Sequence, residues 1–250
     1  MKCCLIRFYA ELNDFLPAEK RQKAFLHFFS GRPAVKDLIE SLGVPHTEAD
    51  LILINGESVG FSRQVEDGDR VSVYPVFESI DISPVLRLRP EPLREVRFVL
   101  DAHLGKLASY LRMVGFDTLY SNDFSDEMLA EISVKERRIL LTRDRGLLKR
   151  SNVTHGCFVR STNSREQLVE VLRRFDLFGA LRPFRRCMCC NGVLEAASRE
   201  EVGERLPARI RERFNEFRLC RNCGRVYWKG SHYEHMKRFL GQLLSGEVAE

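Results

Sequence analysis

The chain has 250 residues, of which 44% are hydrophobic and 30% are charged, and its 40 basic and 35 acidic residues give a formal net charge of +5. This composition is typical of a globular protein with one large or two to three small domains. No apolar run approaches the roughly 18 residues of a membrane span, and no signal-peptide pattern is present. We therefore expect a cytoplasmic protein with no membrane partner. Its eight cysteines should bind metal or remain thiols, because disulfides are rare in that compartment.

The first 80 residues are predicted to form a small α+β domain. An alternating strand (CLIRFY, 4–9), a helix (34–42) and later strands in LILING and VSVYPVF are joined by turns, one of them at Asn55-Gly56. The pattern resembles the ubiquitin-like β-grasp fold, and INGESV with DGDRVSVYP is similar to its sulfur-carrier subgroup. Those carriers act through a C-terminal glycine pair, whereas this strand continues into Val76, Phe77 and Glu78. The resemblance therefore implies a module that docks onto a protein partner.

Prolines mark the next boundary. The stretch SPVLRLRPEP (83–92) contains three prolines, and proline restricts both itself and the residue before it, which is typical of a linker. We divide the chain into a β-grasp domain (1–80), a linker (81–95), an α/β domain (96–180) and a cysteine-containing domain (181–250).

Three aspartates within residues 97–150 follow predicted strands or begin predicted helices. Asp101 ends the strand FVL, Asp126 begins a helix that Ser125 caps, and Asp144 follows the strand RILLT. Ligands collect at the carboxyl ends of parallel strands, although spacing alone does not bring these acids together. Gathered carboxylates repel each other by roughly 1 to 4 kcal/mol per pair, which Mg²⁺ or Mn²⁺ would offset. The alternative is that Asp126 and Asp144 are ordinary helix-start and loop acids.

This stretch resembles the ribonuclease domain of the Mut-seven-C family, a branch of the PIN-like nucleases. The matching motifs are VLDAHLGKLA, SDEML and LLTRDRGLL. The resemblance implies a parallel-sheet α/β fold and a metal site at Asp101, Asp126 and Asp144, with Asp123 as an additional candidate. Many PIN nucleases have a fourth acid beyond the next strand, where this chain has Asn163. The expected substrate contacts are His103, which has the alternative role of a helix-start residue, and Lys106, Arg143, Arg160 and Ser161, of which the last two precede a helix that can bind phosphate.

Cysteines form the most specific pattern in the chain. Cys187 with Cys190 and Cys220 with Cys223 make two C-x2-C pairs separated by 29 residues. Four thiolates suit a structural, tetrahedral Zn²⁺ without an open position, against the alternatives of disulfides or free thiols. Cys189 is expected to be a bystander, and the intervening residues 207–217 are expected to form a helix. The motifs CNGVL and CGRVYWKGSHYEHM are similar to the zinc-ribbon tail of the Mut-seven-C family.

Positive charge is concentrated at the carboxyl end, where residues 181–250 carry 14 basic and 9 acidic residues. Cations and aromatic residues alternate in RNCGRVYWKGSHYEHMKR (221–238). Binding of single-stranded RNA uses this combination, because bases stack on aromatic rings while phosphates pair with cations. The alternative is that Tyr227 and Trp228 pack the core of the zinc domain and that the cations are simply solvated.

These observations predict a three-part α/β protein that hydrolyses single-stranded RNA with an aspartate-held Mg²⁺ or Mn²⁺. Two rival roles fit the same residues. The first rival is a non-catalytic RNA-binding or ribosome-associated adaptor that uses the zinc ribbon and the β-grasp module. The second rival, a nuclease that acts on DNA, would be separated by comparing deoxyribose and ribose versions of one strand, since only RNA carries a 2′-OH.

Overall fold

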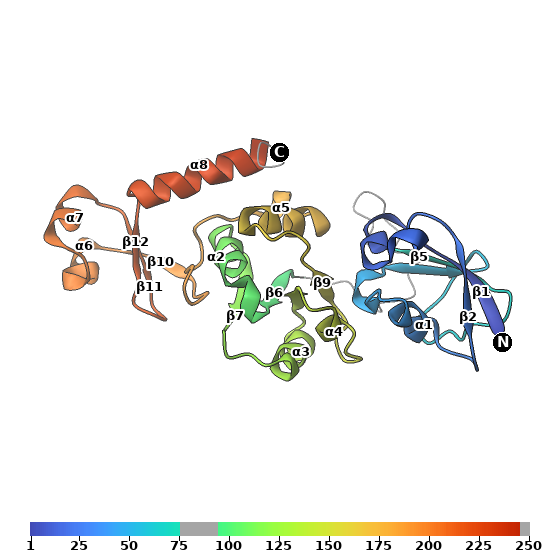
Figure 1. The fold of residues 1–250 in the computed structure, drawn as a ribbon. Coiled ribbons are helices and arrows are strands. Elements are labelled where there is room, and N and C mark those ends of the chain that lie inside the picture. The colour runs from blue at the N-terminus through green and yellow to red at the C-terminus, as the bar shows by residue number, and fades with distance from the viewer. Residues whose placement is uncertain (76–94, 246–250) are drawn as a thin grey trace. The chain divides into compact units, whose positions relative to one another are not determined.

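The computed structural model describes residues 1–75 and 95–245 (Figure 1). The chain divides into two compact units, one formed by residues 1–103 and 123–158 and the other by residues 104–122 and 159–250. Of the linker expected at 81–95, only Glu95 lies within the described residues. The three domain boundaries drawn from the sequence therefore stay predictions.

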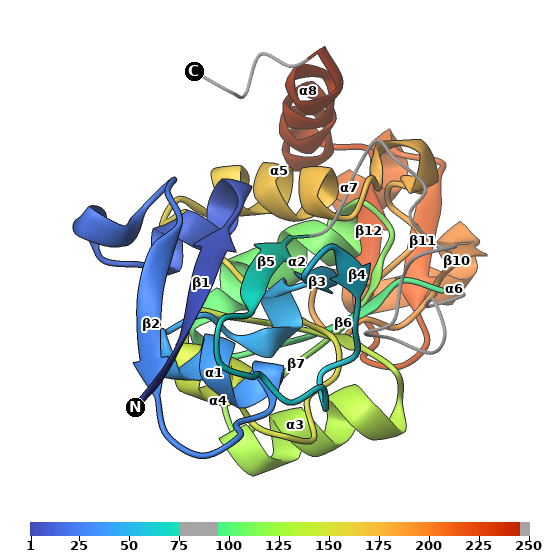
Figure 2. The same cartoon turned by 90° about the vertical axis from the view of Figure 1, so that its right-hand side faces the viewer.

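The N-terminal part of the first unit is a five-stranded mixed sheet in the order β2-β1-β5-β3-β4 (Figure 2). Its strands are β1 (Lys2–Phe8), β2 (Phe25–Phe29), β3 (Leu51–Ile54), β4 (Glu57–Ser58) and β5 (Arg70–Tyr74). Strand β1 pairs antiparallel with β2 and parallel with β5. Alternation along β1 buries Cys4, Ile6 and Phe8 against helix α1 (Val35–Ser41). This is the arrangement expected of a β-grasp domain.

A parallel sheet forms the rest of the first unit. Its strands β6 (Arg97–Leu100), β8 (Ile139–Thr142) and β9 (Gly156–Phe158) pair side by side. Helices α3 (Asp126–Lys135) and α4 (Arg145–Leu148) precede and follow β8. The strands are apolar and almost entirely buried, as in parallel sheets covered on both faces. Because Leu100 pairs with Leu141 and Thr142 with Phe158, the residues that follow β6, β8 and β9 share one edge.

The β-grasp domain is fixed to strand β9 by buried polar contacts. Its 3-10 helix η3 (His46–Glu48) is buried along its whole length. The carboxylate of Glu48 accepts a 2.6 Å hydrogen bond from the backbone N–H of Phe158. The ring nitrogens of His46 contact the Glu40 carboxylate at 2.5 Å and the Val153 carbonyl at 2.8 Å. A buried carboxylate and a buried imidazole therefore span the contact between the two domains.

Cationic side chains of α4 and the residue after it strengthen the same contact. The Lys149 ammonium donates to the Glu40 carbonyl at 2.7 Å. The Arg145 guanidinium lies 5.0 Å from the ring centroid of Phe15 and 5.4 Å from that of Phe158. The two rings meet edge to face at 5.5 Å.

Removing the Glu48 carboxylate is expected to destabilise the first unit. Glu48→Ala leaves the Phe158 N–H without this acceptor in a partly buried setting, which costs up to about 1–3 kcal/mol. Glu48→Gln keeps an acceptor oxygen and should lose less. Urea unfolding followed by circular dichroism measures the difference, with the exposed Glu57→Ala as the control. Equal midpoints for Glu48→Ala and Glu57→Ala would contradict the expected role of this contact.

The second unit contains two helices and a strand from the middle of the chain and a small antiparallel sheet. The middle elements are α2 (Gly105–Met113), β7 (Asp117–Tyr120) and α5 (Ser164–Arg174), followed by the short η6 (Phe178–Ala180). The sheet has the order β10-β11-β12, with strands Leu194–Ala197, Phe217–Cys220 and Val226–Trp228. Between β10 and β11 lie α6 (Arg199–Val202), η7 (Gly203–Arg205) and α7 (Ala208–Arg213).

Two features of the second unit are not expected from the sequence. The helix expected at 207–217 ends at Arg213, because Phe217 is needed as the first residue of β11, where it pairs with Trp228. Residues 231–245, for which the sequence pattern carries no secondary-structure prediction, form a 15-residue helix, α8 (Ser231–Ser245; Figure 1). Helix α8 packs on the rest of the unit through Phe239, whose ring lies 5.4 Å from that of Tyr110 and 4.9 Å from the Arg165 guanidinium.

Within residues 1–75 and 95–245, no helix has both the length and the apolar character needed to cross a membrane.

Candidate active site and candidate metal centre

Asp101 lies at the carboxyl edge of the parallel sheet, directly after β6. Its backbone N–H donates to the Leu141 carbonyl at 3.1 Å, which continues the pairing of β6 with β8 by one residue. The residue as a whole is only 9% exposed. The Thr142 hydroxyl donates to the Asp101 carboxylate at 2.7 Å. The neighbouring strand therefore fixes the position of this carboxylate.

Thr142 also connects Asp101 to Asp144. The backbone N–H of Asp144 donates to the Thr142 hydroxyl oxygen at 2.9 Å, while the Asp144 carboxylate accepts from the Gly146 N–H at 2.6 Å and so caps α4. Asp144 is exposed. The sequence reasoning missed the role of Thr142, although it stands in the same T-R-D motif that singled out Asp144.

Asp126 is the exposed first residue of α3, which is capped as expected by Ser125. The Ser125 hydroxyl accepts from the Met128 N–H at 3.3 Å. Asp123 is exposed and lies three residues earlier. Glu127, the next acid of α3, forms a 3.1 Å ion pair with Arg150. Hydrogen bonding to its own backbone and to Arg150 lowers the pKa of Glu127.

The expected ligands do not converge into a second compact metal group. Across the two described ranges, only the four cysteines form a group of at least three metal-binding side chains close enough to share an ion. His103 is exposed and Arg143 is half-buried. The other expected substrate contacts, Lys106, Arg160 and Ser161, belong to the second unit.

The expected phosphate contacts at Arg160 and Ser161 already bind a carboxylate. Their backbone N–H groups donate to Glu170 at 2.8 and 3.0 Å. The Ser161 hydroxyl donates to Glu166 at 2.6 Å, and Asn163 caps helix α5. A phosphate at these N–H groups would therefore have to displace Glu170.

The four expected cysteines form one group. The sulfur atoms of Cys187, Cys190, Cys220 and Cys223 all lie within 4.8 Å of one another. Cys187 and Cys223 are 3.6 Å apart, and Cys190 and Cys220 are 3.4 Å apart. All four are free of disulfides, and Cys189 is exposed and outside the group, as expected. This set of sulfur donors could bind a metal such as zinc.

Tyr227 supports the group from β12. Its hydroxyl lies 3.1 Å from the Cys187 sulfur. Burial opposes ionisation of Cys187, but hydrogen bonds from Tyr227 and from backbone N–H groups lower the pKa of its thiol to about 7. Burial raises the pKa of the Cys190, Cys220 and Cys223 thiols. Since a metal binds thiolates, its affinity should fall as the pH decreases.

Arg112 and Asn191 anchor the first cysteine pair to α2 and β7. The buried Arg112 guanidinium donates to the Thr118 carbonyl at 2.9 Å and to the Met188 and Cys189 carbonyls at 3.2 and 2.7 Å. The Asn191 side chain accepts from the Thr118 N–H at 3.0 Å and donates to Asp117 at 2.9 Å. Arg112 is therefore a buried structural residue.

Some of the cationic and aromatic side chains of residues 221–238 pack against the rest of the unit, and others are exposed. Arg221 pairs with Glu195 and Glu201 at 3.0 and 2.7 Å. Trp228 packs against the small core that contains Val202 and Phe217, which agrees with the packing alternative for this residue. His232 and His235 are exposed and lie outside the cysteine group.

Cysteine labelling is expected to separate exposed from buried thiols. Burial, with smaller contributions from Asp69 and Cys3, raises the pKa of Cys4 to about 11. Its thiol therefore stays protonated through pH 9, and only thiolates react readily. Iodoacetamide should modify Cys189 in the native protein but leave Cys4 unmodified at pH 7 and at pH 9, as measured by peptide mass spectrometry. Unfolding in urea should make Cys4 reactive, and native labelling of Cys4 at the rate of Cys189 would contradict its burial.

These features define a mixed α/β protein in which a nuclease-like parallel sheet follows a ubiquitin-like mixed sheet. Residues 96–240 match the family model of the Mut7-C RNAse domain, and residues 1–81 match the model of the Mut7-C ubiquitin domain. The chain therefore belongs to the Mut7-C family, a ribonuclease family, and carries its N-terminal ubiquitin-like domain. No significant match was found among curated proteins or among solved structures.

Proposed function

We propose that the chain is a metal-dependent ribonuclease that hydrolyses phosphodiester bonds in single-stranded RNA. The observation that carries this proposal is the buried carboxylate of Asp101 at the carboxyl edge of a parallel sheet, linked through Thr142 to Asp144. The family supplies the reaction class. Ligands bind at this edge in open α/β sheets, so the site has the location that a substrate requires.

The surroundings of Asp101 fit a hard cation. The carboxylate of a buried residue is costly unless it is paired, yet among the described residues the Asp101 side chain has only the Thr142 hydrogen bond and no cationic partner. Mg²⁺ and Mn²⁺ prefer oxygen ligands, and Mg²⁺ usually binds one or two carboxylates and keeps several waters. A site in which the aspartates supply only some of the ligands and water supplies the rest is therefore compatible with Mg²⁺.

We propose that Asp101, Asp126 and Asp144 hold the catalytic metal, with Asp123 as an additional candidate. When bound, Mg²⁺ or Mn²⁺ supplies Lewis acidity and neutralises charge on the reacting phosphate. Thr142 orients the Asp101 carboxylate and, by accepting from the Asp144 N–H, couples the two acids. His103 and Arg143 flank these acids in the sequence and are proposed to bind RNA phosphates. Lys106, Arg160 and Ser161 are proposed as further RNA contacts.

The finer description of the fold belongs to the same proposal. We assign residues 96–180 to a PIN-like nuclease domain, and residues 181–250 to a zinc ribbon in which the four cysteines hold a structural Zn²⁺. The 1–80 domain is proposed to dock onto a protein partner. These assignments rest on the strand order, the sulfur geometry and the family.

A non-catalytic RNA-binding adaptor is the second candidate. The observation in its favour is that, among the described residues, the aspartates do not form a compact metal group. The adaptor would bind RNA equally well with and without Mn²⁺, and substitution of the acids would leave its binding unchanged.

Cleavage of a labelled single-stranded RNA tests the proposal. The wild-type protein is expected to cut in Mn²⁺ and not without added divalent metal, and Asp144→Asn should not cut in Mn²⁺. Glu131→Gln, an exposed acid of α3 that pairs with Lys135, is the matched control and should cut normally. RNA binding without any cutting would support the adaptor, while cutting that survives Asp144→Asn would place the site elsewhere.

A further inference from the structure

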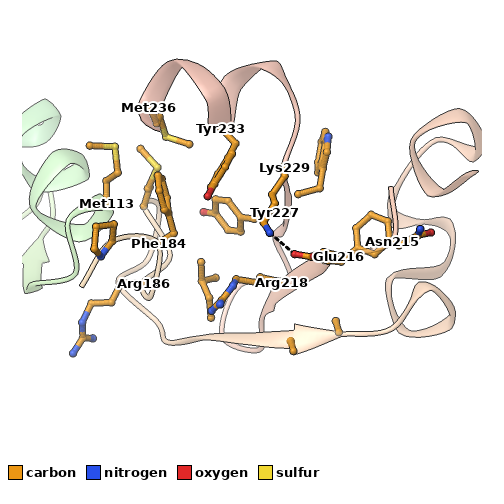
Figure 3. A pocket seen from close by; sticks show the side chains of 17 residues that line it. Met113, Phe184, Arg186, Asn215, Glu216, Arg218, Tyr227, Lys229, Tyr233 and Met236 are labelled. Atoms are coloured by element: carbon orange, nitrogen blue, oxygen red, sulfur yellow. Dashed lines mark ion pairs between the residues drawn. The ribbon is translucent and has the colours of Figure 1, made fainter. Parts of the chain in front are cut away.

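A pocket of about 530 Å³ lies in the second unit between α8, the antiparallel sheet and residues 183–188 (Figure 3). Its volume falls in the roughly 300–1,000 Å³ range of small-ligand sites. None of the expected catalytic acids lines it, and neither do the sulfur ligands of the cysteine group. The pocket is therefore separate from both candidate sites described above.

Aromatic rings line the pocket from three different segments. Tyr227 and Trp228 come from β12, Tyr233 comes from α8, and Phe184 precedes the first cysteine pair. Figure 3 shows Tyr233 reaching from α8 toward Tyr227, with Phe184 beside them. The rings of Phe184 and Tyr233 are 4.7 Å apart at an interplanar angle of 45°. All four residues are only partly buried, so ring surface remains available.

The Tyr227 ring is held in place from behind. Its hydroxyl contacts the Cys187 sulfur at 3.1 Å, and its strand position pairs with Arg218 of β11. A ring fixed in this way loses little conformational entropy when a flat ligand stacks on it. The cysteine group thus stabilises one wall of the pocket.

One of the pocket's cations remains available for an anion. Arg186 pairs with Asp117 at 3.2 Å, and Lys229 pairs with Glu216 at 2.5 Å. Arg218 is exposed and forms no ion pair with any residue that the structure describes. Residues 181–250, which contain Arg218, also carry the largest excess of basic over acidic residues among the predicted domains. An apolar peptide would leave this guanidinium without a partner, whereas a nucleotide would supply both a flat base and a phosphate.

We propose that this pocket binds one unpaired base of a single-stranded RNA, stacked on the rings of Tyr227, Tyr233 and Phe184, with Arg218 on an adjoining phosphate. This inference rests on RNA being the ligand of the proposed function, and it adds a binding subsite separate from the aspartates. The subsite holds the strand and takes no part in cleavage.

The single tryptophan of the chain reports on the proposed subsite, because Trp228 lines the pocket. The experiment uses the full-length, zinc-loaded protein without added Mg²⁺ or Mn²⁺. An eight-nucleotide oligouridine and its abasic ribose-phosphate counterpart are titrated, and both Trp228 emission and anisotropy of the labelled strand are recorded. Oligouridine is expected to change Trp228 emission, whereas the abasic strand should bind more weakly and leave emission unchanged.

Two matched pairs of variants test the walls of the pocket. Tyr233→Leu should weaken oligouridine binding about 5- to 150-fold, the equivalent of one lost stacking contact, and Tyr233→Phe should restore it. His235→Leu, which removes an exposed α8 ring outside the pocket, should have no effect. Arg218→Gln should weaken the binding of both strands. Arg225 is an exposed cation of the same unit outside the pocket, and Arg225→Gln should weaken the binding of both strands less.

The outcomes separate this subsite from the ribonuclease proposal. RNA binding without a Trp228 response, or equal losses for Tyr233→Leu and His235→Leu, would overturn the subsite, even if the protein cuts RNA. A Trp228 response to an apolar dye but not to oligouridine would identify a groove for an apolar partner and would also overturn it. A base-dependent Trp228 response in a protein that never cuts RNA would support the subsite and refute the ribonuclease.

Discussion

Replacing Cys220 with serine is expected to abolish metal binding and to unfold the antiparallel sheet of the second unit. Cys220 ends the central strand β11 and is completely buried beside Cys187 and Leu194. A structural Zn²⁺ contributes on the order of 10–16 kcal/mol to the folding of small domains, and the small core built on the buried residues Val202, Leu206 and Phe217 cannot replace it. Metal content by mass spectrometry and urea unfolding by circular dichroism measure the two losses.

Cys189→Ser is the matched control for this prediction. Cys189 is exposed and lies between the first two ligands, so its replacement should keep both the metal and the unfolding midpoint. Gly192→Ala should resemble Cys220→Ser in direction, because a Cβ at Gly192 would stand 2.9 Å from the Cys220 sulfur. Full metal content and normal stability in Cys220→Ser would show that the four sulfurs do not hold a structural ion.

Substitution of Asp101 by asparagine is expected to remove most RNA cleavage while leaving RNA binding intact. Asparagine keeps the size and can still accept from Thr142, but it removes the charge that attracts the metal. Loss of several kcal/mol of metal-supplied stabilisation corresponds to a fall of about a thousandfold in kcat/KM. Initial rates on a labelled single-stranded RNA in Mn²⁺ measure the change, and a gel shift measures binding.

Thr142→Val provides a graded comparison for the same site. Valine keeps the shape of threonine but removes the hydroxyl that contacts Asp101 and Asp144. Because groups that orient metal ligands are usually worth about 10- to 100-fold, Thr142→Val should cut more slowly than wild type but faster than Asp101→Asn. Unchanged rates in both variants would exclude this edge of the sheet as the catalytic site.

Local pattern was enough to predict much of this fold. Apolar runs and turn signals located strands β1, β6 and β8, and cap chemistry located the start of α3 at Asp126. The spacing of the cysteines predicted which four would assemble, because two C-x2-C turns constrain the geometry of each pair. The family resemblance, which the comparisons confirm, supplied the nuclease assignment that pattern alone could not give.

Long-range contacts could not be read from the same patterns. In the sequence, Arg112 is indistinguishable from a solvent-facing cation on α2, yet its guanidinium donates to three backbone carbonyls. Glu48 and His46 sit in a short polar segment that carries no periodic signal, although both are buried against the parallel sheet. Several partners of these residues lie far away in the sequence. Met188 and Cys189 are 76 and 77 positions from Arg112, Val153 is 107 positions from His46, and Phe158 is 110 positions from Glu48. Local propensity does not encode contacts at such distances.

The contact between Glu48 and Phe158 has a consequence for solubility. Strand β9 is the last strand in its sheet, and an open strand offers unpaired N–H and C=O groups to other chains, which promotes aggregation. The ubiquitin-like domain occupies one of these groups with Glu48 and shields the Phe158 ring with Phe15. We therefore expect this cover to reduce self-association of the chain through β9.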